Sequence, residues 1–429
     1  MEKATPMTCA RISAGLILCC APALAFAFKS IEELPWPSQG KFPAYPMEEG
    51  ARRPTYFWVQ GGAMRDDNLF RLSDGANTQA ILGTSRRSDT VWRLGAGVRS
   101  DLRISRQQVL LDARVENNDY QHFSVLDHLA YRARGEWKWV AGPQWSGSAG
   151  YGTRRYLADL AEIRMPLKDM VTEHHAFASA RYLLTPRWRL RAGLDGLRYE
   201  HSAAQLAPLE SRATAATVGA DYVTPAENSI GGQVRVTDGD FRNREVTAGG
   251  TVDNSYKETE TSAVVRWHVT GKTSLDARLG HTSRKHDQVP QRDFSGATGR
   301  LGFDWTPAGK TLINAAIWRE LHSSGDVSAS YVLSTGYGLG PSWAPTEKVV
   351  LHARWVREER DYRGDPGFVL APAGPRRSDT FRGVRVAAGY TPIRATEIGV
   401  GLDKGERSSN MVNGDYDYTA VSANFRFLF

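Results

Sequence analysis

The sequence predicts an all-β chain that closes into a transmembrane, antiparallel, up-and-down β-barrel of about 18 strands, within a range of 16–18. Three observations lead to this fold class. The chain ends in an alternating aromatic stretch, similar alternation recurs along most of its 429 residues, and proline-containing turns separate the alternating stretches. No stretch approaches the roughly 18 consecutive apolar residues of a membrane-spanning helix, so helical membrane spanning is excluded.

The last stretch of the chain, Tyr416–Phe429, alternates between apolar and mostly polar residues with a period of two. Successive side chains of a strand point to opposite faces, so this stretch predicts a strand with one face in lipid and the other in water. An edge strand of a soluble β-sandwich is the alternative. The terminal phenylalanine, with aromatic residues two and four positions before it, is similar to the C-terminal insertion signal of bacterial outer-membrane barrels. The residues of this predicted signal are Phe425, Phe427 and Phe429.

The N-terminal residues predict export from the cytoplasm. Two basic residues precede an apolar run, Ile12–Leu24, that is too short to span a bilayer as a helix. A small-x-small sequence then predicts cleavage near Ala27, so residues 1–27 are expected to be a signal peptide. A lipoprotein is the alternative, but the bulky Leu18 precedes the cysteine pair. The three cysteines, Cys9, Cys19 and Cys20, all lie in this segment.

We therefore expect three segments. Residues 1–27 are the signal peptide, residues 28–54 are a proline-rich periplasmic lead-in, and residues 55–429 are an outer-membrane β-barrel. The mature protein has no cysteine and thus no disulfide, so another source must stabilise it. A closed, fully hydrogen-bonded barrel is such a source. The expected location is the cell outer membrane.

Proline-containing turns recur from residue 55 onward at a spacing of roughly 40 residues, which accommodates two tilted strands and one longer loop. Proline fixes φ in a turn and has no N–H to donate within a central strand. An even strand number places both termini in the periplasm, every proline turn on that side, and the long connections outside. The turns are Thr185-Pro186, Thr224-Pro225, Thr306-Pro307, Ala344-Pro345 and Thr391-Pro392. The predicted strands are 55–66, 88–100, 106–118, 126–140, 144–155, 173–184, 188–199, 212–223, 228–240, 255–269, 273–285, 295–305, 311–320, 329–343, 348–359, 378–391, 396–404 and 415–429.

The inward face of the predicted barrel is rich in arginine. An 18-stranded barrel is wide enough for an aqueous channel, and guanidinium groups bind carboxylate, sulfate or phosphate through paired hydrogen bonds. An arginine-lined pore therefore favours anions. The alternative is that these arginines brace the wall by pairing with lumen carboxylates, and we expect about half of them to do so. The predicted lumen arginines are Arg93, Arg99, Arg114, Arg132, Arg134, Arg189, Arg191, Arg235, Arg266, Arg278, Arg300, Arg354 and Arg385, with Arg181 on the same face. The predicted lumen acids are Asp112, Glu116, Glu136, Asp195, Asp276, Asp304, Glu358, Glu397 and Asp403.

No motif in the sequence indicates an enzyme, and we expect no catalytic, cofactor-binding or metal-ligating residues. His174 and His175 are neighbours on a predicted strand and so point to opposite faces. Asp127 and His128 resemble part of a hydrolase site, but no spacing selects a nucleophile and its base. No glycine-rich phosphate loop or zinc-ligand spacing occurs. Nucleic acid is not an expected partner, because an exported barrel does not normally meet it.

Two stretches, Asp67–Asp74 and Leu82–Asp89, resemble the EpsL family, which are outer-membrane proteins of exosortase-associated exopolysaccharide gene clusters. The likeness continues at Leu111–Ala113, Asn118–Tyr120, Phe123–Asp127, Trp137–Trp139 and Gly150–Tyr151, and further on it is mainly one of length and hairpin layout. The resemblance implies a barrel that takes part in extracellular polysaccharide biosynthesis and export. It implies no residue-level mechanism. A barrel of this size lined with arginine also looks like the alginate export porin, by analogy of fold alone.

The function predicted from the sequence is an outer-membrane channel that passes an acidic extracellular polysaccharide through its arginine-rich lumen. A general or anion-selective porin for small solutes is the first alternative, and a non-conducting scaffold barrel of the export machinery is the second. The expected partners are outer-membrane lipid, the extracellular polysaccharide, the barrel-assembly machinery through the C-terminal strand, and periplasmic export proteins.

Overall fold

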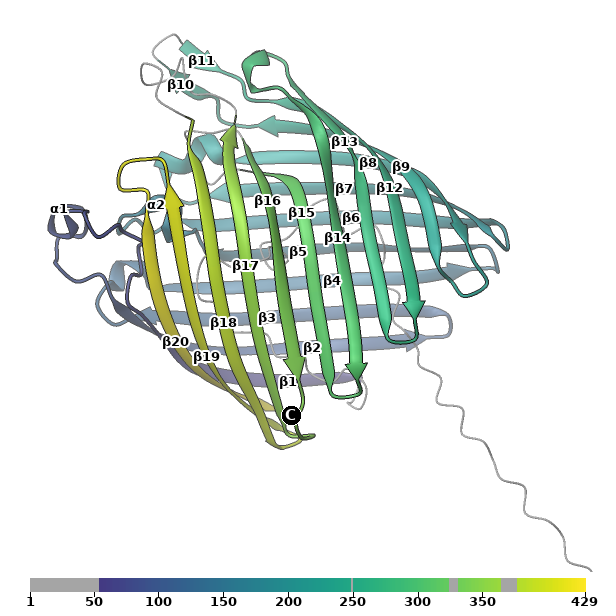
Figure 1. Cartoon of the computed structure of the whole chain (residues 1–429), viewed down its shortest axis with the longest axis horizontal. Helices are drawn as coiled ribbons and strands as arrows, with labels where there is room; N and C mark the ends of the chain where they lie inside the picture. Colours follow the sequence, from purple (N-terminus) through teal and green to yellow (C-terminus); the bar gives the residue numbers. More distant parts are fainter. Residues whose placement is uncertain (1–53, 248–249, 324–330, 364–375) are drawn as a thin grey trace, which may run out of the picture.

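The structure, a computed structural model, describes residues 54–247, 250–323, 331–363 and 376–429. Eighteen strands form one antiparallel sheet that closes on itself, because β1 pairs with both β2 and β20 (Figure 1). The prediction of a closed antiparallel barrel is thus confirmed, with 18 strands from the range of 16–18. The expected signal peptide and all but Pro54 of the expected lead-in lie outside the described residues.

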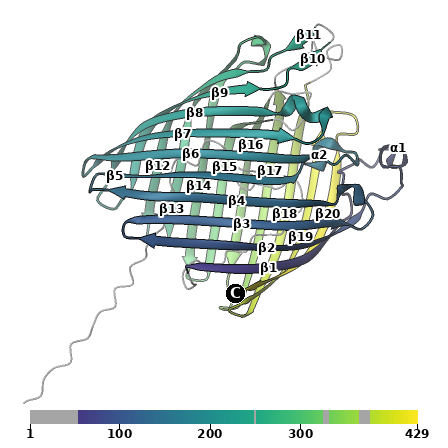
Figure 2. The same ribbon diagram turned by 180° about the vertical axis from the view of Figure 1, so that it is seen from behind.

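Each barrel strand pairs with the barrel strands that precede and follow it along the chain, and β1 pairs with β20, so the order around the barrel is the order along the chain (Figure 2). The strands are β1 (Thr55–Asp66), β2 (Asp89–Ile104), β3 (Gln107–Tyr120), β4 (His128–Ala141), β5 (Trp145–Leu157), β6 (Met170–Thr185), β7 (Trp188–His201), β8 (Ser211–Val223), β9 (Ser229–Phe241), β12 (Tyr256–Thr270), β13 (Thr273–His286), β14 (Phe294–Ala308), β15 (Thr311–Ser323), β16 (Tyr331–Trp343), β17 (Val349–Arg363), β18 (Ser378–Ile393), β19 (Thr396–Ser409) and β20 (Tyr416–Leu428). In a closed barrel no strand edge is left open, so every strand has two hydrogen-bonded neighbours.

The long connections at one end of the barrel contain short elements of their own. These elements are α1 (Thr78–Leu82), α2 (Leu160–Ile163), the hairpin β10 (Glu245–Thr247) and β11 (Gly250–Val252), and 3₁₀ turns at Ser124–Leu126, Ala204–Leu209 and Pro290–Arg292. Figure 1 shows α1, α2 and the β10–β11 hairpin at the same end of the barrel. The opposite end has only short turns, and we call the end with the long connections the mouth.

The predicted strands are confirmed to within a few residues, and the differences have local causes. Pro307 and Pro392 were placed in turns, whereas β14 and β18 continue past them. The pairing register shifts at both places, between Trp305 and Ala308 and between Tyr390 and Ile393. A proline cannot donate to the ladder, so a bulge absorbs it without ending the strand.

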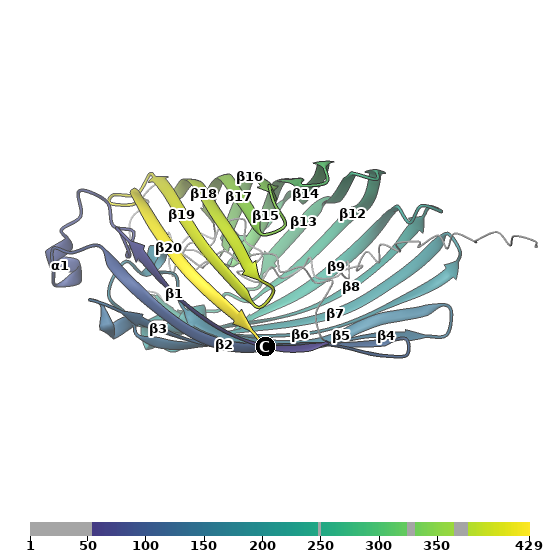
Figure 3. The ribbon, with the colours of Figure 1, turned by 90° about the horizontal axis from the view of Figure 1, so that it is seen from below.

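The outer face of the barrel is apolar around its circumference. Figure 3 shows from below how the strands are tilted. Trp92 and Leu94 on β2, for example, are 57% and 68% exposed, while Arg93 between them points the other way. Exposed tryptophans gather at the short-turn end, including Trp145, Trp188, Trp305 and Trp343. Aromatic residues at this depth belong to the interfacial girdle of a transmembrane barrel.

Candidate solute pathway

Ion pairs bridge neighbouring strands along the inner wall of the barrel. Arg191 and Arg189 share the carboxylate of Asp221, at 3.0 and 3.1 Å. Arg278 joins two acids on different strands, Glu260 at 2.6 Å and Glu320 at 2.9 Å. A buried charge is tolerated only when partners replace its lost hydration, so these pairs allow a charged wall to form.

The structure places the predicted lumen arginines together on this inner wall, and at least eight of the thirteen form ion pairs within 4.0 Å of a described carboxylate. These eight are Arg134, Arg189, Arg191, Arg235, Arg266, Arg278, Arg300 and Arg385. Arg93, Arg99, Arg114 and Arg132 have interaction partners as well. The wall is therefore braced more completely than the sequence suggested, and much of its positive charge is compensated locally.

Several inner-wall charges were missed by the sequence analysis. The missed cations are Arg154, Arg284, Arg360 and Arg407, and the missed acids are Glu173, Asp221, Glu258, Glu260, Glu320 and Asp379. The signal for most of them was present, because they lie an even number of residues from a charge already assigned to the wall. Applying the alternation to every residue of each strand would have included them and lowered the expected excess of positive charge.

Three loops of the mouth fold together into a packed structure that we call the mouth cover: Asp67–Ser88, Gln121–Asp127 and Ala158–Asp169. Phe70, Leu126 and Leu160 from these loops have exposed fractions of 0%, 0% and 1%. They belong to one hydrophobic cluster with inward-facing residues of the wall, including Trp318 and Val356. The cluster is partly held by the edge-to-face contact of Phe70 with Phe123, whose ring centroids are 4.8 Å apart. The loops thus lie inside the mouth and narrow it.

The first loop of the mouth cover is fastened by buried polar contacts. Arg71 forms two parallel hydrogen bonds to Asp66, at 2.8 and 2.7 Å, and its guanidinium lies 3.6 Å over the Tyr418 ring. Burial opposes the charged guanidinium, but the carboxylate of Asp66 outweighs it and raises the pKa of Arg71. Asn68 donates to the carbonyls of Leu72 and Asp417, at 2.8 and 2.9 Å. These contacts connect the loop to β1 and to the last strand.

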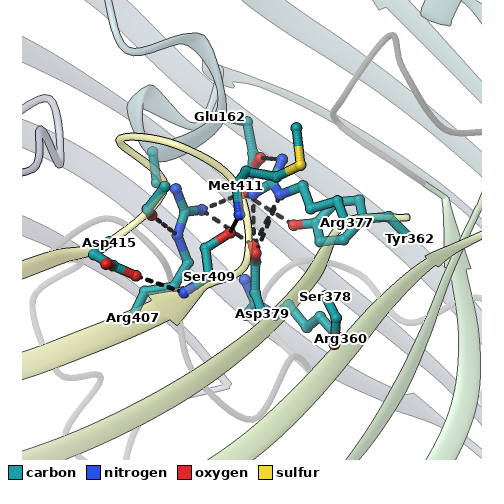
Figure 4. A network of polar contacts seen from close by, with 12 residues as sticks. Glu162, Arg360, Tyr362, Arg377, Ser378, Asp379, Arg407, Ser409, Met411 and Asp415 are labelled. Carbon is teal, nitrogen blue, oxygen red and sulfur yellow. Dashed lines mark hydrogen bonds and ion pairs between the residues drawn. The ribbon is translucent and has the colours of Figure 1, made fainter. Parts of the chain in front are cut away.

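The third loop, which joins β5 to β6, is fastened through Glu162 to β18 and β19, next to the strands that hold the first loop. Asp159 caps α2 by accepting from the backbone N–H of Ala161, which positions Glu162 in the first turn. Glu162 accepts from Arg377 at 2.9 Å and from Arg407 at 3.0 Å, and Figure 4 shows these side chains converging with Asp379. Burial raises the pKa of Glu162, although both arginines act in the opposite direction. Its ionised form therefore depends on these two cations.

The residues that resemble the EpsL family largely build this cover. Asn68, Phe70 and Arg71 belong to the first of the two resembling stretches. Asp89, which ends the second stretch, is 1% exposed and accepts from the backbone N–H of Phe123 at 2.9 Å. The resemblance therefore falls on residues with a structural role at the mouth.

The aromatic residues of the C-terminus face outward. Phe425, Phe427 and Phe429 are 49%, 38% and 60% exposed, and the rings of Phe427 and Phe429 lie 5.0 Å apart in an edge-to-face contact. The backbone N–H of Phe429 donates to Phe57 at 2.9 Å, which helps to close the barrel between its first and last strands. Their role as an insertion signal stays a prediction.

The remaining candidate groups of the sequence are accounted for by local contacts. His174 forms a hydrogen bond with the Tyr151 hydroxyl at 2.7 Å on the outer face, while His175 lies 3.7 Å from Asp195 on the inner face. In the described part of the chain, no three metal-ligating side chains come together. Within the same residues, no helix is both long and apolar enough to cross a bilayer.

No family model and no curated protein matches the chain. Among solved structures it is similar to the Pseudomonas aeruginosa protein OccK2 (OpdF) in complex with glucuronate, with 10% identity, a TM-score of 0.49, and coverage of 87% of this chain and 98% of that one. A BenF-like porin from Pseudomonas fluorescens Pf-5 gives 9% identity and a TM-score of 0.46, with coverage of 87% of this chain and 99% of that one. The alcaligin outer membrane receptor FauA from Bordetella pertussis gives 12% identity and a TM-score of 0.44, with coverage of 88% of this chain and 76% of that one. At these values the likenesses identify no solute or partner for this chain.

Proposed function

We propose that the chain is an outer-membrane channel for small hydrophilic solutes, with a preference for anions. The observation that carries this proposal is a closed barrel with an apolar exterior and a charged interior, whose extracellular mouth is narrowed by a packed cover. An apolar outer band suits a bilayer, and a charged interior is expected to hold water.

The mouth cover favours a small solute over a polymer. Its core includes Trp318 and Val356, which lie well inside the barrel. Its first and third loops are also fastened to the wall by polar contacts with Asp66 of β1 and Arg407 of β19. A polymer conduit of the same strand number is expected to keep its mouth open. Extracellular polysaccharide export, which the EpsL resemblance implies, stays a prediction, and in that case the cover would have to move aside.

The preference for anions follows from the inner wall. Arginine is fixed in charge, and the whole chain has a formal charge of +7. Most wall arginines are paired with acids, so we expect a moderate preference and not exclusion of cations. Arg354 is one wall arginine for which no described residue supplies a carboxylate within 4.0 Å.

The proposed surroundings of the channel follow from the same geometry. Outer-membrane lipid would contact the apolar exterior, and the barrel-assembly machinery would engage the C-terminal strand. Periplasmic export proteins remain proposed partners only for the polysaccharide and scaffold alternatives.

Single-channel recording of the purified protein in planar bilayers tests the proposal. We expect a steady conductance and a zero-current potential in a KCl gradient that favours chloride over potassium. In liposome-swelling assays, monosaccharides should enter much faster than oligosaccharides. Absence of conductance would favour the scaffold alternative, and rapid entry of long acidic oligosaccharides would favour polysaccharide export.

A further inference from the structure

One level of the inner wall, between β14 and β19, combines an uncompensated charge with free space. At this level the neighbouring strands present, in order, Asp304, Asn314, Gly340, Arg354, Arg385 and Asp403. Gly340 of β16 takes its place beside Arg354 of β17, because the flanking register pairs are Leu339 with Trp355 and Ser342 with His352. Adjacent strands are about 4.8 Å apart, so Asp304 is roughly 14 Å from Arg354 across the sheet.

The charge of Arg354 is surrounded by further positive charge. Its register partner on β18 is Arg385, which already binds Asp403 on β19. Among the described residues, none gives Arg354 a hydrogen bond or a carboxylate within 4.0 Å, and the charges that act on it are those of Arg385 and Arg300. Other arginines of this wall, such as Arg235 with Asp195 at 3.1 Å, have an acid close by. An anion beside Arg354 would relieve this repulsion.

Space for an anion lies beside the guanidinium, at Gly340. A Cβ atom added there would meet only the backbone oxygens of Ala353 at 3.8 Å and Asn314 at 3.9 Å, which is ordinary van der Waals contact. Two other inward glycines differ, because a tryptophan ring fills the place of the missing side chain: Trp318 at Gly336 and Trp58 at Gly97. The wall therefore has a recess beside Arg354.

The recess lies directly beneath the mouth cover. Val356, two residues along β17 from Arg354, has an exposed fraction of 0% and belongs to the core of the cover. Residues two apart on a strand are about 6.6 Å apart and share a face. A solute that passes the cover on this side of the lumen would meet Arg354 next.

We propose that Arg354 and the recess at Gly340 form a binding site for a carboxylate on the solute pathway, which rests on the proposed channel function. The planar guanidinium donates two parallel hydrogen bonds to the two oxygens of a carboxylate. Gly340 lets the solute approach the backbone, and Arg385 adds a second positive charge. A spherical halide gains the charge attraction but cannot use the paired geometry, so the site prefers a carboxylate to chloride.

The test compares Arg354→Lys with Arg354→Gln, using acetate and chloride as potassium salts at equal concentration. Zero-current potentials in planar bilayers give the permeability ratio of acetate to chloride and that of chloride to potassium. Arg354→Lys retains the positive charge but loses the two parallel donors of the guanidinium. The acetate-to-chloride permeability ratio should therefore fall by roughly three- to tenfold, while the chloride-to-potassium ratio changes little. Arg354→Gln should lower both ratios.

Two further variants complete the test. Gly340→Leu fills the recess without a change in charge, and it should lower the acetate-to-chloride ratio in the same direction. Arg266→Lys is the matched control, because Arg266 faces the same lumen but is already paired with Asp276 at 3.1 Å, and it should leave the ratio unchanged.

An unchanged acetate-to-chloride ratio in folded Arg354→Lys would overturn the carboxylate site, whatever Gly340→Leu gives. A wild-type channel with no preference for anions would instead contradict the proposed function. The two failures are distinguishable, because the first concerns a difference between two anions and the second concerns anions against cations. Migration of the unboiled protein as a compact band on gels verifies that each variant is folded.

Discussion

The mouth cover and the inner wall of the barrel are built in opposite ways. The wall consists of strands whose backbone groups are hydrogen-bonded to two neighbours, and its ion pairs, such as Arg235 with Asp195, are added to that ladder. The cover consists of loops with little regular structure, and side chains such as Phe70, Arg71 and Glu162 hold it in place. Loss of one side chain therefore removes a larger share of what holds the cover.

This contrast indicates which part of the barrel opens first. Regions held by few contacts open locally at a lower free energy than regions held by a continuous hydrogen-bond network. We expect disruption of the cover to widen the mouth and leave the barrel folded, whereas matched changes in the wall should alter the mouth little.

The largest effect is expected from Arg407→Ala. Arg407 is 1% exposed, donates to Glu162 at 3.0 Å and to the carbonyl of Gly414 at 3.0 Å, and lies 3.7 Å from Asp379. Without Arg407, the buried carboxylates of Glu162 and Asp379 have one fewer cation beside them. Removal of one partner of a buried ion pair costs roughly 3–5 kcal/mol of stability. The third loop should detach, and single-channel conductance should rise.

Arg382→Ala is the matched control for this change. Arg382 also forms an ion pair in this region, with Glu406 at 3.3 Å, but both side chains are more than half exposed. An exposed pair contributes at most about 1 kcal/mol, so conductance should stay at the wild-type value. Equal conductance of Arg407→Ala and wild type would show that the Glu162 contacts do not hold the mouth.

The next effect is expected from Phe70→Ala, which removes a ring from the core of the cover. Phe70 has an exposed fraction of 0% and contacts Phe123 edge to face. We expect a cost of about 3 kcal/mol, at the low end for Phe→Ala, because a loop can partly collapse onto the cavity. Proteolysis of the intact barrel should then cleave within Asp67–Ser88. The control is Val125→Ala, since Val125 is 53% exposed on a neighbouring loop.

The barrel was predictable from the sequence because its signal is local. Trp92, Arg93 and Leu94 show the alternation without reference to any distant residue, and the same holds for most strands. Strand ends were less predictable where a proline was taken as a stop, as at Pro307 and Pro392. The helices α1 and α2 gave no periodic signal, because each is only one turn long or little more.

The mouth cover was not predicted, because its contacts join distant segments. Glu162 and Arg407 are 245 residues apart, and no local pattern links them. One signal was present, since Leu69, Phe70 and Leu72 are unusually apolar for an exposed external loop. For the wall, alternation assigned Arg354 to the lumen, but which arginines have an acid within reach depends on register and on side-chain conformation.

A smaller effect is expected when an ion pair of the wall is replaced by apolar residues. Arg235 and Asp195 lie 3.1 Å apart with exposed fractions of 5% and 7%. In the double variant Arg235→Met with Asp195→Leu, both charges are removed together, and such replacements are often neutral or stabilising by about 1–4 kcal/mol. The backbone ladder remains, so thermal unfolding followed by circular dichroism should shift little, and conductance should not rise as in Arg407→Ala. A large loss of stability would mean that the wall depends on its ion pairs.

The smallest effect is expected from acidification, acting on Asp169 at the end of the third loop. Burial alone would raise the pKa of Asp169, but hydrogen bonds from His201 at 2.7 Å and from the backbone N–H of Ala203 at 2.9 Å outweigh it and hold the pKa below the ordinary 3.8. A carboxyl with a lowered pKa in the folded state contributes stability that is present above pH 3.8 and is lost as the pH falls through the folded value. This connection between the loops after β5 and β7 should therefore loosen only below about pH 4.

Brief pepsin digestion between pH 2 and 4 measures the loosening, with wild type compared to Asp169→Asn. Wild type should become susceptible within Ala158–Asp169 as the pH falls, while the variant should be cleaved there at every pH and show no further step. The amide of the variant can still accept one hydrogen bond, but it does not titrate. If cleavage increased equally in both proteins as the pH fell, the loosening would have to be assigned to other carboxyls. Because the cover also has the contacts of Glu162 and Phe70, the conductance change at low pH should remain well below that of Arg407→Ala.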